Sequence, residues 1–169
     1  MTSVYTSKYL SQLKELGFSW VKIGSAQARD VALLFDYVKE FNMVVSTGGH
    51  ELHELSLPAG TYGVLHCVSK YPTKPFETNL ARMLEIKHKW PDKKVGFSSH
   101  VDPGSLNWDQ PLKAAICMGA DILEVHFNIL GPEAKDDCVS LDERQLREIG
   151  KFHTMGLTER AREMPQLGM

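Results

Sequence analysis

The stretch Ile122-Leu123-Glu124-Val125-His126-Phe127 combines apolar residues with one carboxylic acid and one imidazole. It is short and mostly apolar, which is typical of a buried β-strand. Side chains alternate between the two faces of a strand, so Glu124 and His126 share one face while the apolar residues share the other. A carboxylate on a buried face needs a polar partner, because an unpaired buried charge is costly. The stretch therefore predicts a strand whose end belongs to a polar site.

Four more short apolar runs read as strands, and Thr2–Tyr5 resembles the end of another. Between them lie segments with helical periodicity. Asp30 and Ser140 are predicted helix caps, the second completing a capping box with Glu143, and Asn42 is a predicted left-handed helix stop. The predicted strands are 20–23, 43–46, 62–68, 95–98 and 122–127, and the predicted helices are 6–16, 30–41, 77–90, 109–119 and 141–153.

The repeated order of strand, loop and helix indicates a parallel sheet with helices outside it. An open doubly wound sheet and a (β/α)8 TIM-type barrel both fit this order. No G-x-G-x-x-G follows a strand, and polar residues gather at the strand ends, which favours the barrel. A complete barrel needs about 200–250 residues. We therefore predict an α/β fold of incomplete barrel type with its first strands missing, over residues 1–153, and a frayed polar tail over 154–169.

Composition excludes several function classes. The 169 residues are 43% hydrophobic and 24% charged, as in an ordinary single globular domain. A net charge of −2 gives no indication of binding to nucleic acid or an anionic membrane, and no run is apolar enough to span a bilayer. Three widely spaced cysteines fit a reducing compartment, so a cytoplasmic location is expected.

Two histidines and one lysine stand out as site candidates. His100 follows the strand 95–98, and together with His126 and the neighbouring Glu124 it could hold a divalent metal. Lys22 lies in an apolar strand, where lysine is almost never buried unpaired, so an anionic partner is expected. His66 lies in mid-strand and is predicted to be structural. The remaining histidines are predicted to face solvent: His50, His53, His88 and His153.

Five motifs in order resemble those of the sialic acid synthase family, which includes N-acetylneuraminate synthases and spore-coat polysaccharide enzymes. Each motif alone is weak, but five in sequence at strand-length intervals are specific. The resemblance covers most of the chain, from about Thr2 to the helix after Ser140. The motifs are Lys22-Ile23-Gly24-Ser25, Ser46-Thr47-Gly48-Gly49, Leu65-His66-Cys67-Val68-Ser69-Lys70-Tyr71-Pro72-Thr73, Gly96-Phe97-Ser98-Ser99-His100 and Glu124-Val125-His126-Phe127.

The resemblance implies a (β/α)8 barrel enzyme that condenses phosphoenolpyruvate with an N-acyl amino sugar to give a sialic-acid-type 2-keto acid. By the family pattern, His100 and His126 would be metal ligands, usually for manganese. Tyr71 and Glu124 would be catalytic residues facing the sugar. Residues that would bind substrate are Lys22, Ser25, Ser46, Ser69, Ser98 and Asp136.

The chain departs from the family pattern at several positions. Ser99 stands where the family usually has aspartate, Gln27 where glutamate is common, and Pro132–Asp136 only loosely matches a Gly-Pro-Asp loop. The family's first strands, which carry a catalytic glutamate, have no counterpart. Three hypotheses follow: an enzyme fragment, a non-catalytic module that binds phosphoenolpyruvate and metal, or a piece that associates with another copy or with a missing N-terminal fragment.

Overall fold

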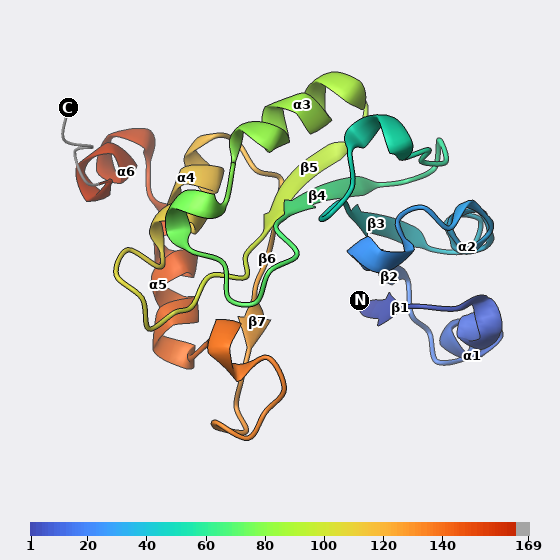
Figure 1. Cartoon of the computed structure of the whole chain (residues 1–169), viewed down its shortest axis with the longest axis horizontal. Coiled ribbons are helices and arrows are strands. Elements are labelled where there is room, and N and C mark those ends of the chain that lie inside the picture. Colours follow the sequence, from blue (N-terminus) through green and yellow to red (C-terminus); the bar gives the residue numbers. More distant parts are fainter. Residues whose placement is uncertain (165–169) are drawn as a thin grey trace.

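The computed structural model describes residues 1–164 and contains a six-stranded parallel sheet. The strands follow one another across the sheet in the order in which they occur in the chain (Figure 1). They are β1 (Thr2–Val4), β2 (Trp20–Ile23), β3 (Asn42–Ser46), β4 (Gly63–Cys67), β5 (Lys94–Ser98) and β6 (Ile122–Glu124). Two short strands, β7 (His126–Phe127) and β8 (Ser140–Leu141), form a second parallel pair.

This strand order decides between the two predicted architectures. A doubly wound sheet reverses its strand order at a switch point, whereas a barrel adds each strand beside the previous one. The order β1 to β6 contains no reversal, so the structure is an arc of a (β/α) barrel. The prediction of an incomplete barrel is confirmed.

Helices cover the outer face of this arc (Figure 1). Buried apolar helix residues such as Leu34 pack with outward-facing strand residues such as Val21 and Phe97, and this layer forms the buried core. The helices are α1 (Leu10–Glu15), α2 (Val31–Val38), α3 (Ala81–Lys89), α4 (Gln110–Cys117), α5 (Glu143–Thr154) and α6 (Leu157–Glu163). Short 3-10 turns cover Ser7–Tyr9, Ser25–Gln27, Leu52–Glu54, Pro75–Glu77 and Asp137–Val139.

The predicted caps are partly right. Asp30 caps α2 by accepting a hydrogen bond from the backbone of Leu33, as expected. Asn42 is no helix stop, because α2 ends at Val38 and Asn42 begins β3. Ser140 does not cap α5; Asp142 does, in a reciprocal capping box with Gln145. Ser140 instead pairs with His126 in a strand that the sequence did not indicate.

Two other segments differ from the prediction. The strand 122–127 is divided at Val125, because β6 pairs with β5 whereas β7 pairs with β8. The predicted tail, 154–169, contains α6, whose Arg160 Nε donates to the Phe152 carbonyl and so ties the helix back to α5. The last part of that prediction, 165–169, lies outside the described residues.

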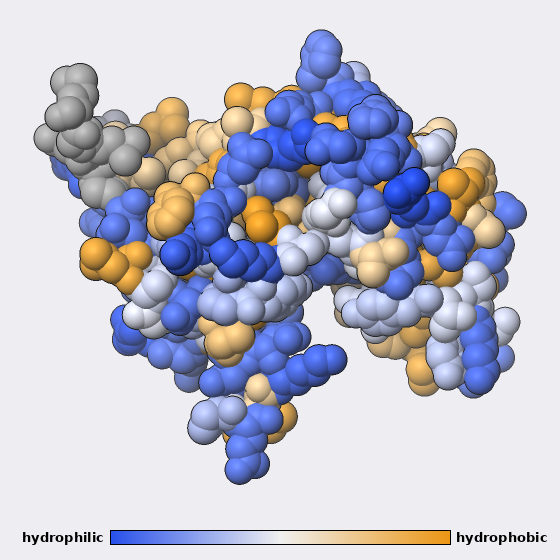
Figure 2. Space-filling view, viewed as in Figure 1, coloured by the Kyte–Doolittle hydropathy of each residue, from blue (hydrophilic) through white to orange (hydrophobic). Residues whose placement is uncertain are grey.

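The surface is hollowed on one side of the arc. Figure 2 shows this hollow between the α1 end of the molecule and the lobe that follows β7. Within residues 1–164, none of the helices has the length and apolar character needed to cross a membrane.

Candidate functional site

The candidate site lies on the inner face of the arc, at the carboxyl ends of the strands. The sheet register pairs Cys67 with Ser98 and Ser98 with Glu124, which places these three side chains in one row on one face. Lys22 pairs with Val44 on the same side of β2 and β3, two residues before Ser46. The strand alternation therefore aims the predicted polar residues inward while the core residues point to the helices.

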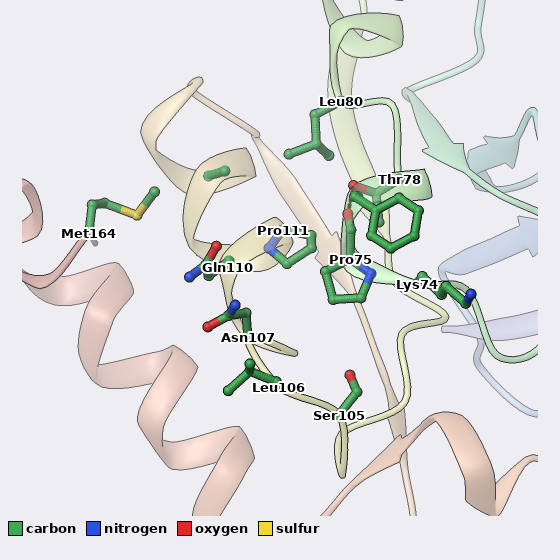
Figure 3. Close-up of a pocket in the computed structure, with 12 residues that line it drawn as sticks. Lys74, Pro75, Thr78, Leu80, Ser105, Leu106, Asn107, Gln110, Pro111 and Met164 are labelled. Atoms are coloured by element: carbon green, nitrogen blue, oxygen red, sulfur yellow. Dashed lines mark hydrogen bonds between the residues drawn. The ribbon is translucent and has the colours of Figure 1, made fainter. Parts of the chain in front are cut away.

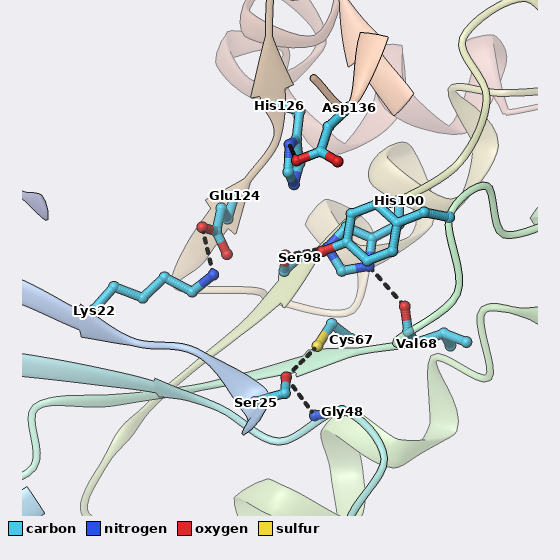
Figure 4. Close-up of polar contacts among 11 residues, drawn as sticks. Lys22, Ser25, Gly48, Cys67, Val68, Ser98, His100, Glu124, His126 and Asp136 are labelled. Carbon is cyan, nitrogen blue, oxygen red and sulfur yellow. Dashed lines mark hydrogen bonds and ion pairs between the residues drawn. The ribbon is translucent and has the colours of Figure 1, made fainter. Parts of the chain in front are cut away.

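Lys22 and Glu124 form an ion pair across the inner face (Figure 4), with 2.8 Å between Nζ and Oε1. Their side chains are only 15% and 22% exposed. An ammonium has three donors, and this pair uses one of them. The second carboxylate oxygen of Glu124 is buried and has no hydrogen-bond partner in the protein. The partner of Lys22 in the protein is thus a carboxylate. Lys22 keeps hydrogen-bond donors, and Glu124 keeps one acceptor oxygen, that a ligand could use.

His100 is held in one tautomer. Its Nδ1 lies 2.7 Å from the Val68 carbonyl oxygen, which can only accept, so Nδ1 carries the hydrogen. Nε2 accepts from the Tyr71 hydroxyl at 2.8 Å and lies 3.5 Å from the Ser98 hydroxyl. Burial lowers the pKa of His100 and outweighs the hydrogen bond to Val68, which by itself would raise that pKa. A neutral imidazole with its Nε2 lone pair facing the site is the form that a metal ligand requires.

Tyr71 joins the two histidines. Its ring stacks on His100, with ring centroids 4.0 Å apart, and meets His126 edge-on at 5.7 Å. The centroids of His100 and His126 are 5.4 Å apart, and His126 Nδ1 lies 3.8 Å from an Asp136 carboxylate oxygen. Burial, then the nearby Cys67, Asp136 and Glu124, raises the pKa of Tyr71 to about 12. The phenol therefore stays protonated and remains a donor at neutral pH.

A second polar group surrounds Ser25. Its Oγ accepts from the Gly48 amide at 3.0 Å and lies 3.2 Å from Cys67 Sγ (Figure 4). A Cβ on Gly48 would lie 2.4 Å from Ser69 Oγ and 2.6 Å from Cys67 Sγ, so only glycine fits between these side chains. The Ser46 hydroxyl is buried without a partner. Three of the predicted hydroxyls thus lie at the ends of β2, β3 and β4.

The predicted site residues therefore fall into three contact groups. The pair of Lys22 and Glu124 forms one, and the hydroxyls around Gly48 form another. The third is the ring cluster of Tyr71, His100 and His126, with Ser98 and Asp136 at its edge. Within residues 1–164, no three side chains of the His, Cys, Asp and Glu types lie close enough together to bind one metal ion.

Sequence reasoning missed three residues of this site. Cys67 faces Ser25, and Gly48 lets the backbone pass close to the Ser69 and Cys67 side chains. His50, predicted to face solvent, is half-buried, and its ring bonds to the Ser25 carbonyl at 2.7 Å. The double glycine at 48–49 was a usable signal, since a glycine pair after a strand marks a close backbone approach. Nothing local in the sequence marks the contact of His50, because Ser25 lies 25 residues away in the chain.

His66 lies outside the site, as predicted. Its ring points to the outer face, where Nε2 donates to the Thr78 carbonyl at 2.6 Å, and the side chain is buried. Burial lowers the pKa of His66 and outweighs the hydrogen bond to Thr78, which by itself would raise that pKa.

A pH prediction follows from His66. Because its folded-state pKa is below the unfolded value, the unfolded chain binds more protons as pH falls through about 6.5, and stability is lost on the acid side. One such group contributes at most about 1.4 kcal/mol per pH unit. We expect His66→Gln to reduce the loss in free energy of unfolding between pH 7.5 and 5.5, measured by urea denaturation. The same change at exposed His88 should leave that loss unaltered; equal slopes in both variants would contradict the prediction.

An apolar pocket of about 650 Å³ lies elsewhere, between the turn Pro75–Glu77 and α4 (Figure 3). Pro75, Leu106 and Pro111 line it, with Met164 at its side. It lacks the convergent polar groups of the inner face, so the inner face remains the candidate site.

Known proteins resemble this chain in sequence and in structure. A curated relative, the N-acetylneuraminate-9-phosphate synthase of Drosophila melanogaster, is 27% identical over 157 residues, which cover 87% of this chain and 41% of the relative. The Bacillus subtilis spore coat polysaccharide biosynthesis protein SpsE is 33% identical over 118 residues, covering 64% of this chain and 30% of the relative. The chain thus spans less than half the length of these relatives.

A solved structure shows the same fold. The N-acetylneuraminic acid synthetase of Leptospira borgpetersenii superposes with a TM-score of 0.78 at 21% identity, covering 99% of this chain and 58% of that one. The model of the NeuB family matches residues 1–155, which is most of the sequence. The chain forms an incomplete barrel of this fold, and it belongs to the NeuB family.

Proposed function

We propose that this chain forms one half of a synthase site, the half that binds phosphoenolpyruvate and a divalent metal. Manganese is the metal to test first. The observation that carries the proposal is the convergence of Lys22, three hydroxyls and a neutral His100 at the carboxyl ends of neighbouring parallel strands. An ammonium, hydroxyls and backbone amides are suited to the phosphate and carboxylate of one small dianion. In barrels, function gathers at this end of the strands.

Two side chains of the ring cluster, His100 and His126, are of the type that a divalent metal takes as ligands. His100 and His126 would hold the ion through their ring nitrogens, with water or substrate oxygens in the other positions. When bound, a divalent metal supplies Lewis-acid polarisation of a carbonyl oxygen. The Asp136 carboxylate, 3.8 Å from His126 Nδ1, would favour the orientation of this ring electrostatically, in the place where carboxylates stand behind ligating histidines.

The reaction proposed for the whole protein joins phosphoenolpyruvate to an N-acyl amino sugar. The new carbon–carbon bond forms between the enol carbon and the sugar aldehyde, and water releases the phosphate. Lys22 and the hydroxyls hold the phosphoenolpyruvate, while the free oxygen of Glu124 and the Tyr71 hydroxyl lie where a sugar hydroxyl could bind. The NeuB family membership and the named synthases among the relatives support this class of reaction.

Calorimetric titration of the metal-free chain, first with MnCl2 and then with phosphoenolpyruvate, tests the proposal. We expect saturable binding of both. His100→Ala and His126→Ala should each weaken manganese binding at least tenfold, since loss of even a residue that only orients a ligand commonly costs about 10–100-fold. His88→Ala, on the exposed side of α3, is the control and should bind as the wild type does.

A turnover assay distinguishes a chain that is catalytic alone from one that only binds the two ligands. Phosphate release from phosphoenolpyruvate that depends on an N-acyl amino sugar would show that the chain is catalytic alone. Binding of both ligands without release would identify a non-catalytic module, or a half-site completed by another segment. Failure of phosphoenolpyruvate to bind would overturn the proposal.

A further inference from the structure

The turn after β3 carries a histidine that the proposed reaction does not use. Thr47 anchors the turn to β4, because its backbone amide and its hydroxyl both donate to the Leu65 carbonyl, at 3.0 and 3.2 Å. Gly49 has φ +76°, which lets the chain reverse. The His50 amide then closes the turn on the Thr47 carbonyl at 3.3 Å. His50 is therefore fixed at the end of a turn whose second residue is Gly48.

The His50 ring reaches across to β2. Its Nε2 lies 2.7 Å from the Ser25 carbonyl oxygen, so Nε2 must be the donor. The same carbonyl accepts the Ala28 amide at 3.1 Å, which begins the short 3-10 turn after β2. The His50 ring thus joins the turn after β3 to the backbone of Ser25 and fixes the distance between them.

Arg82 of α3 holds the other side of His50. One guanidinium nitrogen donates to the His50 carbonyl at 3.2 Å and to Glu51 at 3.1 Å, while the other pairs with Glu85 at 2.6 Å. The Arg82 side chain is 20% exposed. The backbone of His50 is therefore bound on its amide side by its own turn and on its carbonyl side by a helix, which fixes the point from which the ring extends.

This arrangement sets the direction of the Ser25 hydroxyl. Ser25 Oγ accepts from the Gly48 amide, so its own hydrogen remains available to donate. Its neighbour Cys67 Sγ, 3.2 Å away, is a weak hydrogen-bond partner whichever of the two atoms donates. A phosphate or carboxylate oxygen would take this hydrogen in preference to sulfur, so the hydroxyl is prepared for an anion.

We infer that His50 is a positioning residue: through its bond to the Ser25 carbonyl it holds the Ser25 hydroxyl and the Gly48 amide in the geometry that binds the anionic substrate. The inference rests on the proposed function, because it assigns His50 to the same phosphoenolpyruvate site. Since the ring acts only as a hydrogen-bond donor, a glutamine, whose amide nitrogen reaches a similar distance, should replace it.

The test compares His50→Leu, His50→Asn and His50→Gln in the full chain, with His53→Leu on the same segment as the control because His53 is exposed. Phosphoenolpyruvate affinity is measured by calorimetry. We expect a loss of about tenfold for the leucine variant, and a similar loss for asparagine, whose amide is too short to reach Ser25. The glutamine variant and the His53 control should stay within about twofold of the wild type.

A second measurement does not depend on any ligand. Hydrogen exchange of the Gly48 amide, followed by NMR, reports whether its bond to Ser25 Oγ persists. It should accelerate in His50→Leu and His50→Asn and remain slow in His50→Gln. If the wild type fails to bind phosphoenolpyruvate, the proposed function fails, and this exchange still decides whether His50 positions Ser25.

Two results would overturn the inference. One is unchanged affinity and unchanged Gly48 exchange in His50→Leu. The other is an equal loss of affinity in His50→Leu and His50→Gln, which would mean that the ring itself, and not its donor, is required.

Discussion

Replacement of Lys22 by methionine should weaken phosphoenolpyruvate binding by roughly 100-fold, equivalent to about 2.7 kcal/mol. The lysine places a positive charge on the inner face beside Glu124, and it retains donors beyond the one that bonds to Glu124. Methionine keeps the length and most of the apolar stem, so the change removes charge and donors rather than volume. Calorimetry of the variant with phosphoenolpyruvate measures the effect.

The same substitution leaves Glu124 as a largely buried carboxylate without its partner, and this should also lower stability. The double variant Lys22→Met with Glu124→Gln separates the two effects. It should recover stability in urea denaturation, because no charge is stranded, but it should not recover binding. Recovery of binding in the double variant would show that Lys22 serves only to neutralise Glu124.

The surface pair of Lys14 and Glu40 provides a matched control. Its atoms are 2.6 Å apart, but its side chains are 50% and 36% exposed. Exposed ion pairs contribute about 0–1 kcal/mol. Lys14→Met should therefore change neither binding nor stability by more than this, although it removes the same charge from the chain.

Replacement of Phe97 by alanine should lower the free energy of unfolding by about 3–5 kcal/mol, the usual loss for a fully buried phenylalanine. Phe97 is 1% exposed, lies in the outer row of β5 and stacks on the His66 ring with centroids 5.9 Å apart. The loss is a large part of the 5–15 kcal/mol that typically stabilises a domain. Urea denaturation followed by circular dichroism measures it.

Phe76 is the control for this prediction, since it is the same residue type at 82% exposure. Phe76→Ala should change the free energy of unfolding by no more than about 0.5 kcal/mol. A small effect at Phe97 as well would show that the outer layer between sheet and helices is loosely packed, and would contradict the core described above.

The sequence contained enough to predict the sheet but not its details. Apolar runs separated by helical periods identified all five main strands, because a strand buried on both faces leaves a continuous apolar signal. The division at Val125 could not be predicted, since it depends on β8, a two-residue strand that carries no signal of its own. The cap at Asp142 was missed because Ser140, Asp142, Glu143 and Gln145 offer two overlapping capping boxes.

For the candidate site, the sequence predicted which side chains face it but not the contacts that hold them. Alternation alone placed Glu124 on the polar face, and the expectation that Lys22 requires an anionic group is met by that same carboxylate. The roles in binding and catalysis stay predictions. The contacts that fix His100 and Ser25 join residues 25 to 32 positions apart, through backbone carbonyls of Val68 and Ser25. Backbone acceptors are the same at every position, so no residue pattern reveals which one a side chain will meet.

The unbroken strand order also has a consequence for how the chain folds. Partners in neighbouring strands of the sheet are between 19 and 31 residues apart in the chain, from Thr2 with Val21 to Val64 with Val95. The entropy lost in closing loops of these lengths differs by less than about 0.5 kcal/mol. Each added strand therefore meets nearly the same entropic barrier, and the order in which the ribosome releases the strands is the order in which they can dock. Such a sheet can grow one strand at a time by repeated, similar steps during synthesis.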